Sequence, residues 1–202
     1  PQLQRISFSF WSTGVLALAV GYAWSLDGLA IAGWIALCVA AVALLTNLVD
    51  CRLRASGDLS LAARVVGAAQ PLLLAGLIVI STAAIADGPA LALSGSTRIA
   101  AGTLLVVGWI GLTVLGSLLH LLAVVVRVRS FTEPMPKARP RLDIAVAAAA
   151  MVSVACLSTC QLAGLEDLGQ LARFAVLAVY SYLAAAVAFR ATKVIKLAFP
   201  RI

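Results

Sequence analysis

An uncharged run of 27 residues, Ala100 to Val126, constrains the fold of this chain more than any other stretch. It ends at Arg127 and contains the only histidine in the sequence, His120. A helix needs about 20 apolar residues to cross the hydrocarbon core of a bilayer, so this run is long enough to be a membrane span. Only 11% of the chain is charged, against about 25% in soluble domains, so lipid is predicted to be its main solvent.

Five further apolar stretches are long enough to cross a bilayer. The sequence therefore predicts an all-α polytopic transmembrane bundle of six helices. Each stretch is predicted to be helical because lipid offers backbone groups no hydrogen-bond partner. We expect one transmembrane domain over residues 1–202, with spans at residues 6–26, 29–49, 61–86, 100–126, 142–165 and 171–190 and an interfacial C-terminal segment over residues 191–202. Only Asp27 and Gly28 separate the first two spans, which predicts a tight antiparallel hairpin.

Lysine and arginine are distributed unevenly among the predicted connections. With the N-terminus inside, 13 of the 15 basic residues lie on the inner side, and only Arg98 and Arg173 lie outside. Cytoplasmic loops of membrane proteins carry this excess, so both termini are predicted to be cytoplasmic. The arginine-rich, alanine- and leucine-rich composition is typical of GC-rich bacterial coding, and we therefore expect a multi-pass protein of the bacterial cytoplasmic (inner) membrane.

The inner side includes a basic, proline-rich connection from Arg127 to Arg141. Its three prolines favour an extended loop. Two interpretations remain open, a solvated loop that touches anionic lipid head groups and a docking segment for a partner subunit. The candidate contact residues are Arg127, Arg129, Lys137, Arg139 and Arg141.

His120 is the first candidate for chemistry. Helical spacing places Trp109, Thr113, Gly116, Ser117 and His120 on one face of the fourth span. Small and polar residues along one face mediate close helix packing in lipid, so we expect this face to point into the bundle. Three roles remain open for the imidazole: a hydrogen bond to a neighbouring helix, ligation of haem or copper, and relay of a proton or ion.

Two amide side chains are predicted to lie near His120. Gln70 and Asn47 fall in the same cytoplasmic third of their spans, and Pro71 is predicted to kink the third span. Polar residues buried together in a membrane form a candidate site, although they also serve as contacts between helices. The predicted intramembrane polar cluster consists of His120, Gln70, Asn47, Thr113 and Ser117.

The sequence lacks the patterns of the common catalytic sites. We find no glycine-rich phosphate loop, no HExxH motif, no Ser/His/Asp set and no paired carboxylates within a span. All eight acidic residues lie at span ends or in loops, which argues against carboxylate-driven ion transport. Cys156 lies roughly 10 Å deeper than His120 by helical rise, so a joint Cys/His metal site is disfavoured and the metal, if any, is unknown.

The string GWIGLTVLGSLLHLL, Gly108 to Leu122, resembles a helix of haem-copper-oxidase-like and nitric-oxide-response-type membrane proteins of bacteria. The stretch from Leu45 to Gln70 is also similar to theirs. Those families use many spans and several histidines as haem and copper ligands. Because this chain has one histidine, the resemblance implies at most one axial ligand, His120.

Three functional hypotheses follow. The first is an integral membrane subunit with a structural or assembly role in a larger complex, such as an oxidoreductase, whose partners are other membrane subunits or a second copy. The second is a haem- or copper-binding protein that uses His120. The third is a small-solute channel or transporter lined by the polar cluster. We expect the lipid bilayer to be a partner and nucleic acid not to be one.

Overall fold

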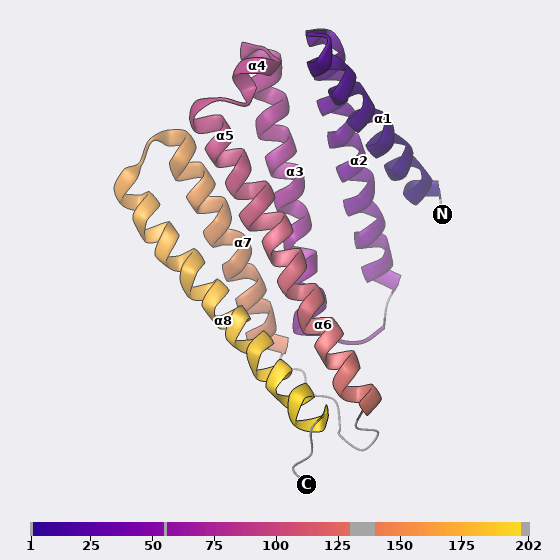
Figure 1. The fold of residues 1–202 in the computed structure, drawn as a ribbon, viewed down its shortest axis with the longest axis vertical. Helices are drawn as coiled ribbons and strands as arrows, with labels where there is room; N and C mark the ends of the chain where they lie inside the picture. The colour runs from indigo at the N-terminus through magenta and orange to yellow at the C-terminus, as the bar shows by residue number, and fades with distance from the viewer. Residues whose placement is uncertain (1, 55, 130–139, 199–202) are drawn as a thin grey trace.

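The computed structural model describes residues 2–54, 56–129 and 140–198, and these residues form helices without any β-strand. Six helical stretches among them are long and apolar enough to cross a membrane, as the sequence predicts. Successive stretches run in opposite directions, side by side (Figure 1). They are α1 (Gln2–Ala23), α2 (Asp27–Arg54), α3 (Leu61–Asp87), the joined stretch Gly95–Val128, α7 (Pro140–Ala163) and α8 (Glu166–Ala198).

The fourth span is not a uniform α-helix. After a four-residue helix, α4 (Pro89–Ala92), the chain enters α5 (Gly95–Gly102), continues as a π-helix, η1 (Thr103–Gly111), and leaves as α6 (Leu112–Arg129). A π-helix is rare, and its wider turn displaces the side chains that follow it from the positions of a regular α-helix. The uncharged composition that predicts the span carries no signal for this change of turn.

The last helix continues past its predicted end at residue 190, because α8 runs unbroken from Glu166 to Ala198 and includes the described part of the predicted interfacial segment over residues 191–202. Pro71, which is predicted to kink the third span, lies inside α3, and α3 continues as one helix from Leu61 to Asp87. Residues 130–139, which hold most of the predicted basic loop, lie outside the described residues.

The first two spans form the predicted antiparallel hairpin, joined by residues 24–26. Their backbones approach closely because glycines line the contact: a Cβ on Gly21 would lie 2.6 Å from the backbone nitrogen of Ala30, and one on Gly33 would lie 3.0 Å from the carbonyl of Gly14. Close backbone approach through small residues is how helices associate in lipid, where apolar burial supplies little driving force.

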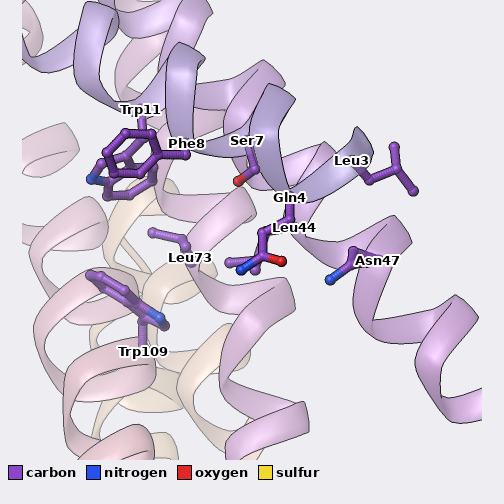
Figure 2. A pocket seen from close by; sticks show the side chains of 9 residues that line it. All are labelled: Leu3, Gln4, Ser7, Phe8, Trp11, Leu44, Asn47, Leu73 and Trp109. Atoms are coloured by element: carbon purple, nitrogen blue, oxygen red, sulfur yellow. The ribbon is translucent and has the colours of Figure 1, made fainter. Parts of the chain in front are cut away.

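The hairpin leaves a groove where it meets the rest of the bundle. α2 packs on α3 through a small apolar cluster that includes Leu37, Ala41, Leu73 and Leu77. Beside this cluster, a groove of about 380 Å³ lies between the hairpin and the helices α3 and η1 (Figure 2). The groove is therefore bounded by α1, α2, α3 and η1.

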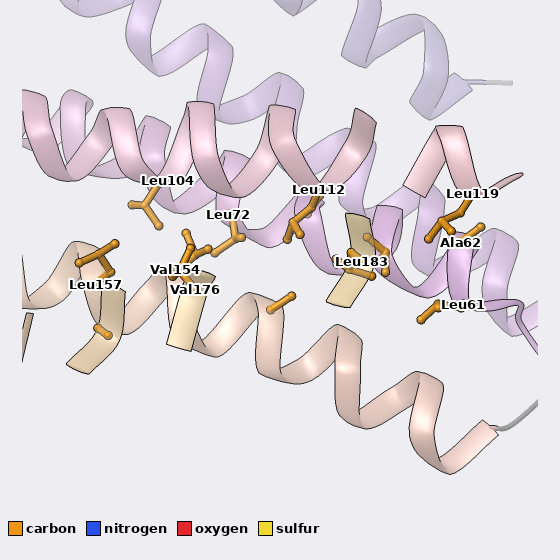
Figure 3. Close-up of a cluster of buried hydrophobic side chains, with 14 residues drawn as sticks. Leu61, Ala62, Leu72, Leu104, Leu112, Leu119, Val154, Leu157, Val176 and Leu183 are labelled. Atoms are coloured by element: carbon orange, nitrogen blue, oxygen red, sulfur yellow. The ribbon is translucent and has the colours of Figure 1, made fainter. Parts of the chain in front are cut away.

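The largest buried cluster ties α3 to the fourth span, α7 and α8 (Figure 3). Leu112, Leu119 and Leu183 are fully buried within it. α3 is the most enclosed span, with 50% of its apolar window buried, whereas the figure for α1 is 11%. The bundle thus has a four-span core around α3 and a peripheral hairpin whose outermost helix is α1.

Candidate functional site

The structure does not bring the five residues of the predicted polar cluster together. Gly116 lies against Val66 on the antiparallel helix α3. His120 is four residues beyond Gly116 in one direction along the bundle, and Gln70 is four residues beyond Val66 in the opposite direction. At a rise of 1.5 Å per residue, His120 and Gln70 are separated by roughly 12 Å along the bundle axis. The prediction that His120 and Gln70 lie at the same depth is therefore wrong.

His120 and Ser117 have exposed side chains on the outer side of α6. The inward stripe of α6 consists instead of Leu112, Gly116 and Leu119, at the i, i+4, i+7 spacing of one helical face. His120 follows Leu119 by one residue and is thereby turned about 100° away from that stripe. The prediction that the His120 side chain points into the bundle is wrong, because the core of this chain selects the leucines of α6.

Two other members of the cluster are enclosed but do not form a site. Gln70 is 7% exposed, and its amide donates to the carbonyl of Val66 on its own helix at 3.2 Å. The hydroxyl oxygen of Thr113 is buried without a hydrogen-bond partner among the described residues. The Gln70 bond stays within its own helix and the Thr113 hydroxyl makes none, so the two side chains form no shared ligand set for a cofactor.

The described parts of the chain hold no group of three His, Cys, Asp or Glu side chains that is placed to bind a metal ion. The thiol of Cys38 lies 3.2 Å from the hydroxyl of Ser81, and Cys156 is exposed on α7. His120 therefore offers one ligand from an outer face of the described bundle.

The groove beside the hairpin gathers side chains that sequence reasoning missed. Its lining combines aromatic and aliphatic residues with three polar ones: Leu3, Gln4, Ser7, Phe8, Trp11, Leu44, Asn47, Leu73 and Trp109. The indoles of Trp11 and Trp109 lie 6.3 Å apart between centroids, at 57°. Of the predicted cluster, only Asn47 lines this groove. Trp11 and Trp109 are far apart in the sequence, so no local sequence pattern predicts their contact.

The groove is apolar at one end and polar at the other. Figure 2 shows the indole rings and Phe8 at one end and the amides of Gln4 and Asn47 toward the other. Ser7 is already engaged, because its hydroxyl donates to the carbonyl of Ala40 on α2 at 3.0 Å. A volume of about 380 Å³ falls in the range of small-ligand sites, and this polarity suits an amphipathic molecule.

The wide-turn segment positions one wall of the groove. Trp109 belongs to η1, where the N–H of Leu112 donates to the carbonyls of Gly108 and Trp109. The hydroxyl of Tyr180 on α8 donates to the carbonyl of Val107 in the same segment. This hydrogen bond joins η1 to α8 on the side of the fourth span opposite the groove. It therefore helps to fix the position of the η1 backbone that carries Trp109.

The end of the bundle at which α6 ends and α7 begins, called the basic end below, contains the described residues of the predicted basic loop. Arg127 and Arg141 are exposed, and Arg129 is the last residue of α6. Lys137 and Arg139 fall outside the described residues. A further basic residue, Arg190, is partly buried, and its guanidinium donates to the carbonyl of Leu119 at 2.6 Å. Arg190 thereby joins α8 to α6 near His120.

Comparison with known proteins adds no relative: no protein-family model, no curated protein and no solved structure matches the chain. The resemblance of Gly108–Leu122 to haem-copper-oxidase-like proteins accordingly stays a prediction.

Proposed function

We propose that this chain is an integral membrane subunit with a structural or assembly role in a larger membrane complex, such as an oxidoreductase. The observation that carries the proposal is the exposure of Ser117 and His120 on the outer side of α6. Lipid offers these side chains no hydrogen-bond partner, whereas a helix of another subunit does. The outer face of α6 is therefore the surface that we assign to the partner.

We further propose a bacterial cytoplasmic membrane as the location, with both termini on the cytoplasmic side. The support is the distribution of charge on the described residues. Arg98 in α5 and Arg173 in the first part of α8 belong to elements near the acidic starts of α2 and α8. The other described basic residues belong to the starts of α1, α3 and α7 and the ends of α2, α6 and α8, which lie toward the opposite end (Figure 1). That opposite end is the one expected to face the cytoplasm.

Replacement of His120 by leucine tests the subunit proposal. An interhelical hydrogen bond in a membrane contributes about 1–2 kcal/mol in model peptides, so His120→Leu should weaken the complex by roughly 5- to 30-fold. The measurement is co-purification in a mild detergent, with complex mass followed by size-exclusion chromatography and light scattering. We expect the wild-type chain to elute with other chains and the variant to elute largely without them.

Thr82→Leu is the matched control, because Thr82 is also exposed on a span but its hydroxyl donates to the carbonyl of Ile78 on its own helix at 2.9 Å. This variant should retain the complex. A wild-type chain that is stable and monomeric in mild detergent, with both leucine variants equally stable, would show that the outer face of α6 meets lipid and would contradict the proposal.

A haem- or copper-binding role is the second candidate, and the exposed imidazole of His120 is the observation that favours it. On an outer face, the imidazole is accessible to an ion or haem shared with a partner subunit. Visible absorption spectra test for haem in the purified complex, and elemental analysis tests for copper. The absence of both would remove this candidate.

The transport hypothesis receives no support from the positions of its proposed lining residues, because Ser117 and His120 lie outside the bundle and Gln70 lies inside it. Unchanged solute flux in a His120→Ala, Gln70→Ala double variant would dispose of it.

A further inference from the structure

We propose that the groove between α1, α2, α3 and η1 binds one anionic phospholipid from the leaflet at the basic end of the bundle. An acyl chain lies along the apolar wall formed by Phe8, Leu44 and Leu73, against the pair of contacting indoles. The phosphate lies at the polar end, beside Gln4 and Asn47, and the long side chain of Arg5, which follows Gln4 on α1 outside the groove lining, approaches it from the rim. This site is separate from the outer face of α6 on which the subunit proposal depends.

The position of the groove makes lipid its occupant. Each element that bounds it belongs to a stretch long and apolar enough to span a membrane. The groove is open at the surface of the hairpin, and α1, which forms one of its edges, packs against little besides α2. Hydrocarbon chains are the apolar molecules that surround such a surface in a bilayer, and the indoles provide a rigid wall for them.

The polar end of the groove has unused hydrogen-bonding capacity. In the part of the chain that the structure describes, the side-chain amides of Gln4 and Asn47 have no hydrogen-bond partner. Each amide supplies two N–H donors, which suit phosphate and ester oxygens. Figure 2 shows both amides extending into the same space between the helices. The oxygens of a lipid head group are acceptors that match these donors.

Charge selects an anionic head group. Arg5 is exposed next to Gln4 and makes no ion pair within the described residues, where the one ion pair joins Arg54 to Asp50 at 2.9 Å. That pair offsets the acidic residue nearest to Asn47 along α2. A guanidinium binds phosphate through paired N–H donors, and its long side chain extends toward the head-group region. A basic side chain near the membrane surface contributes about 1 kcal/mol to binding of anionic lipid.

Fluorescence of Trp11 and Trp109 reports the occupied groove directly. The full-length chain is purified in detergent and titrated with phosphatidylglycerol or phosphatidylcholine that carries brominated acyl chains, since bromine quenches nearby indoles. We expect saturable quenching, with phosphatidylglycerol binding about fivefold tighter, which corresponds to about 1 kcal/mol. The Trp11→Phe, Trp109→Phe double variant should lose the saturable component, because Trp24 and Trp34 are not in the groove lining.

Variants at the polar end separate this site from general lipid contact. Arg5→Gln should reduce phosphatidylglycerol binding to the level of phosphatidylcholine, and Asn47→Leu should weaken binding of both lipids. Arg98→Gln is the matched control, because Arg98 is an exposed arginine far from the groove lining. It should keep the full preference.

Three outcomes would overturn the proposal. Quenching that rises without saturation and equally for both lipids would show contact with bulk lipid only. A preference for phosphatidylglycerol that survives Arg5→Gln would place the anion elsewhere. Absence of quenching at saturating lipid would show that no acyl chain enters the groove. Circular dichroism of each variant confirms that its helices are formed, so every outcome bears on the site.

Discussion

A leucine in place of Gly33 should detach α1 from α2 and abolish the groove. A Cβ at this position would lie 2.9 Å from the backbone nitrogen of Leu18 and 3.0 Å from the carbonyl of Gly14. Backbone atoms of a packed helix cannot move aside as a flexible side chain can, so the whole of α1 has to shift. Overpacking a close contact costs typically 1–3 kcal/mol, and we expect about 3 kcal/mol here because a full leucine must be accommodated.

The free energy of unfolding is measured by circular dichroism while the denaturing detergent is increased. Gly67→Leu is the matched control: Gly67 is a helical glycine on a span, and nothing lies within 4 Å of a Cβ built on it. This variant should be as stable as the wild type or slightly more stable, since leucine favours helix over glycine. Equal stability of the Gly33 and Gly67 variants would contradict the close contact between α1 and α2.

The six spans were predictable because one physical requirement fixes them. A helix that crosses the lipid needs about 20 apolar residues, and its backbone N–H and C=O groups must hydrogen-bond within the helix. Long apolar stretches in the sequence therefore identify the spans. The ends of spans were less predictable. Asp27, which is predicted to lie between the first two spans, is the first residue of α2, and the last helix continues past Arg190 to Ala198. At a membrane surface, water can hydrogen-bond the backbone groups of a helix or of a loop. The apolar composition therefore does not determine where a helix ends.

The direction in which a helical face points was not predictable from its own residues. The spacing from Trp109 to His120 shows which residues share a face, but in lipid an inward face need not be the polar one. The core selected Leu112, Gly116 and Leu119, and it left His120 outside. The π-helix before them adds a second uncertainty, because its wider turn shifts everything downstream by an amount that the sequence does not specify.

The groove required knowledge of which spans are neighbours. Trp11 and Trp109 come from the first and fourth spans, and each one alone suits an ordinary apolar helix. The amides of Gln4 and Asn47 were visible in the sequence, and Asn47 was singled out for its depth. What sequence reasoning lacked was the register of the hairpin, which the glycine contacts set. A search for glycines spaced to match between adjacent predicted spans would have suggested that register.

Gly116→Leu should destabilise the four-span core by about 3 kcal/mol. The loss of stability is as large as for Gly33→Leu, but it should affect more helices. A Cβ on Gly116 would lie 2.6 Å from a methyl carbon of Val66 and 3.0 Å from the carbonyl of Ala62, so α6 would be pushed away from α3. Ala62 and Leu119 belong to the large buried cluster that also includes residues of α7 and α8 (Figure 3). The disturbance should therefore spread through the core.

Hydrogen exchange of the two glycine variants in detergent distinguishes a peripheral lesion from a central one. In Gly33→Leu, faster exchange should be confined to α1 and α2, because α1 packs against little besides α2. In Gly116→Leu, it should extend over α3, α6 and α8, since Arg190 of α8 donates to the carbonyl of Leu119 only while α6 keeps its place. Uniformly faster exchange in both variants would mean that hairpin and core unfold as one unit, and the division of the bundle into a core around α3 and a peripheral hairpin would then be wrong.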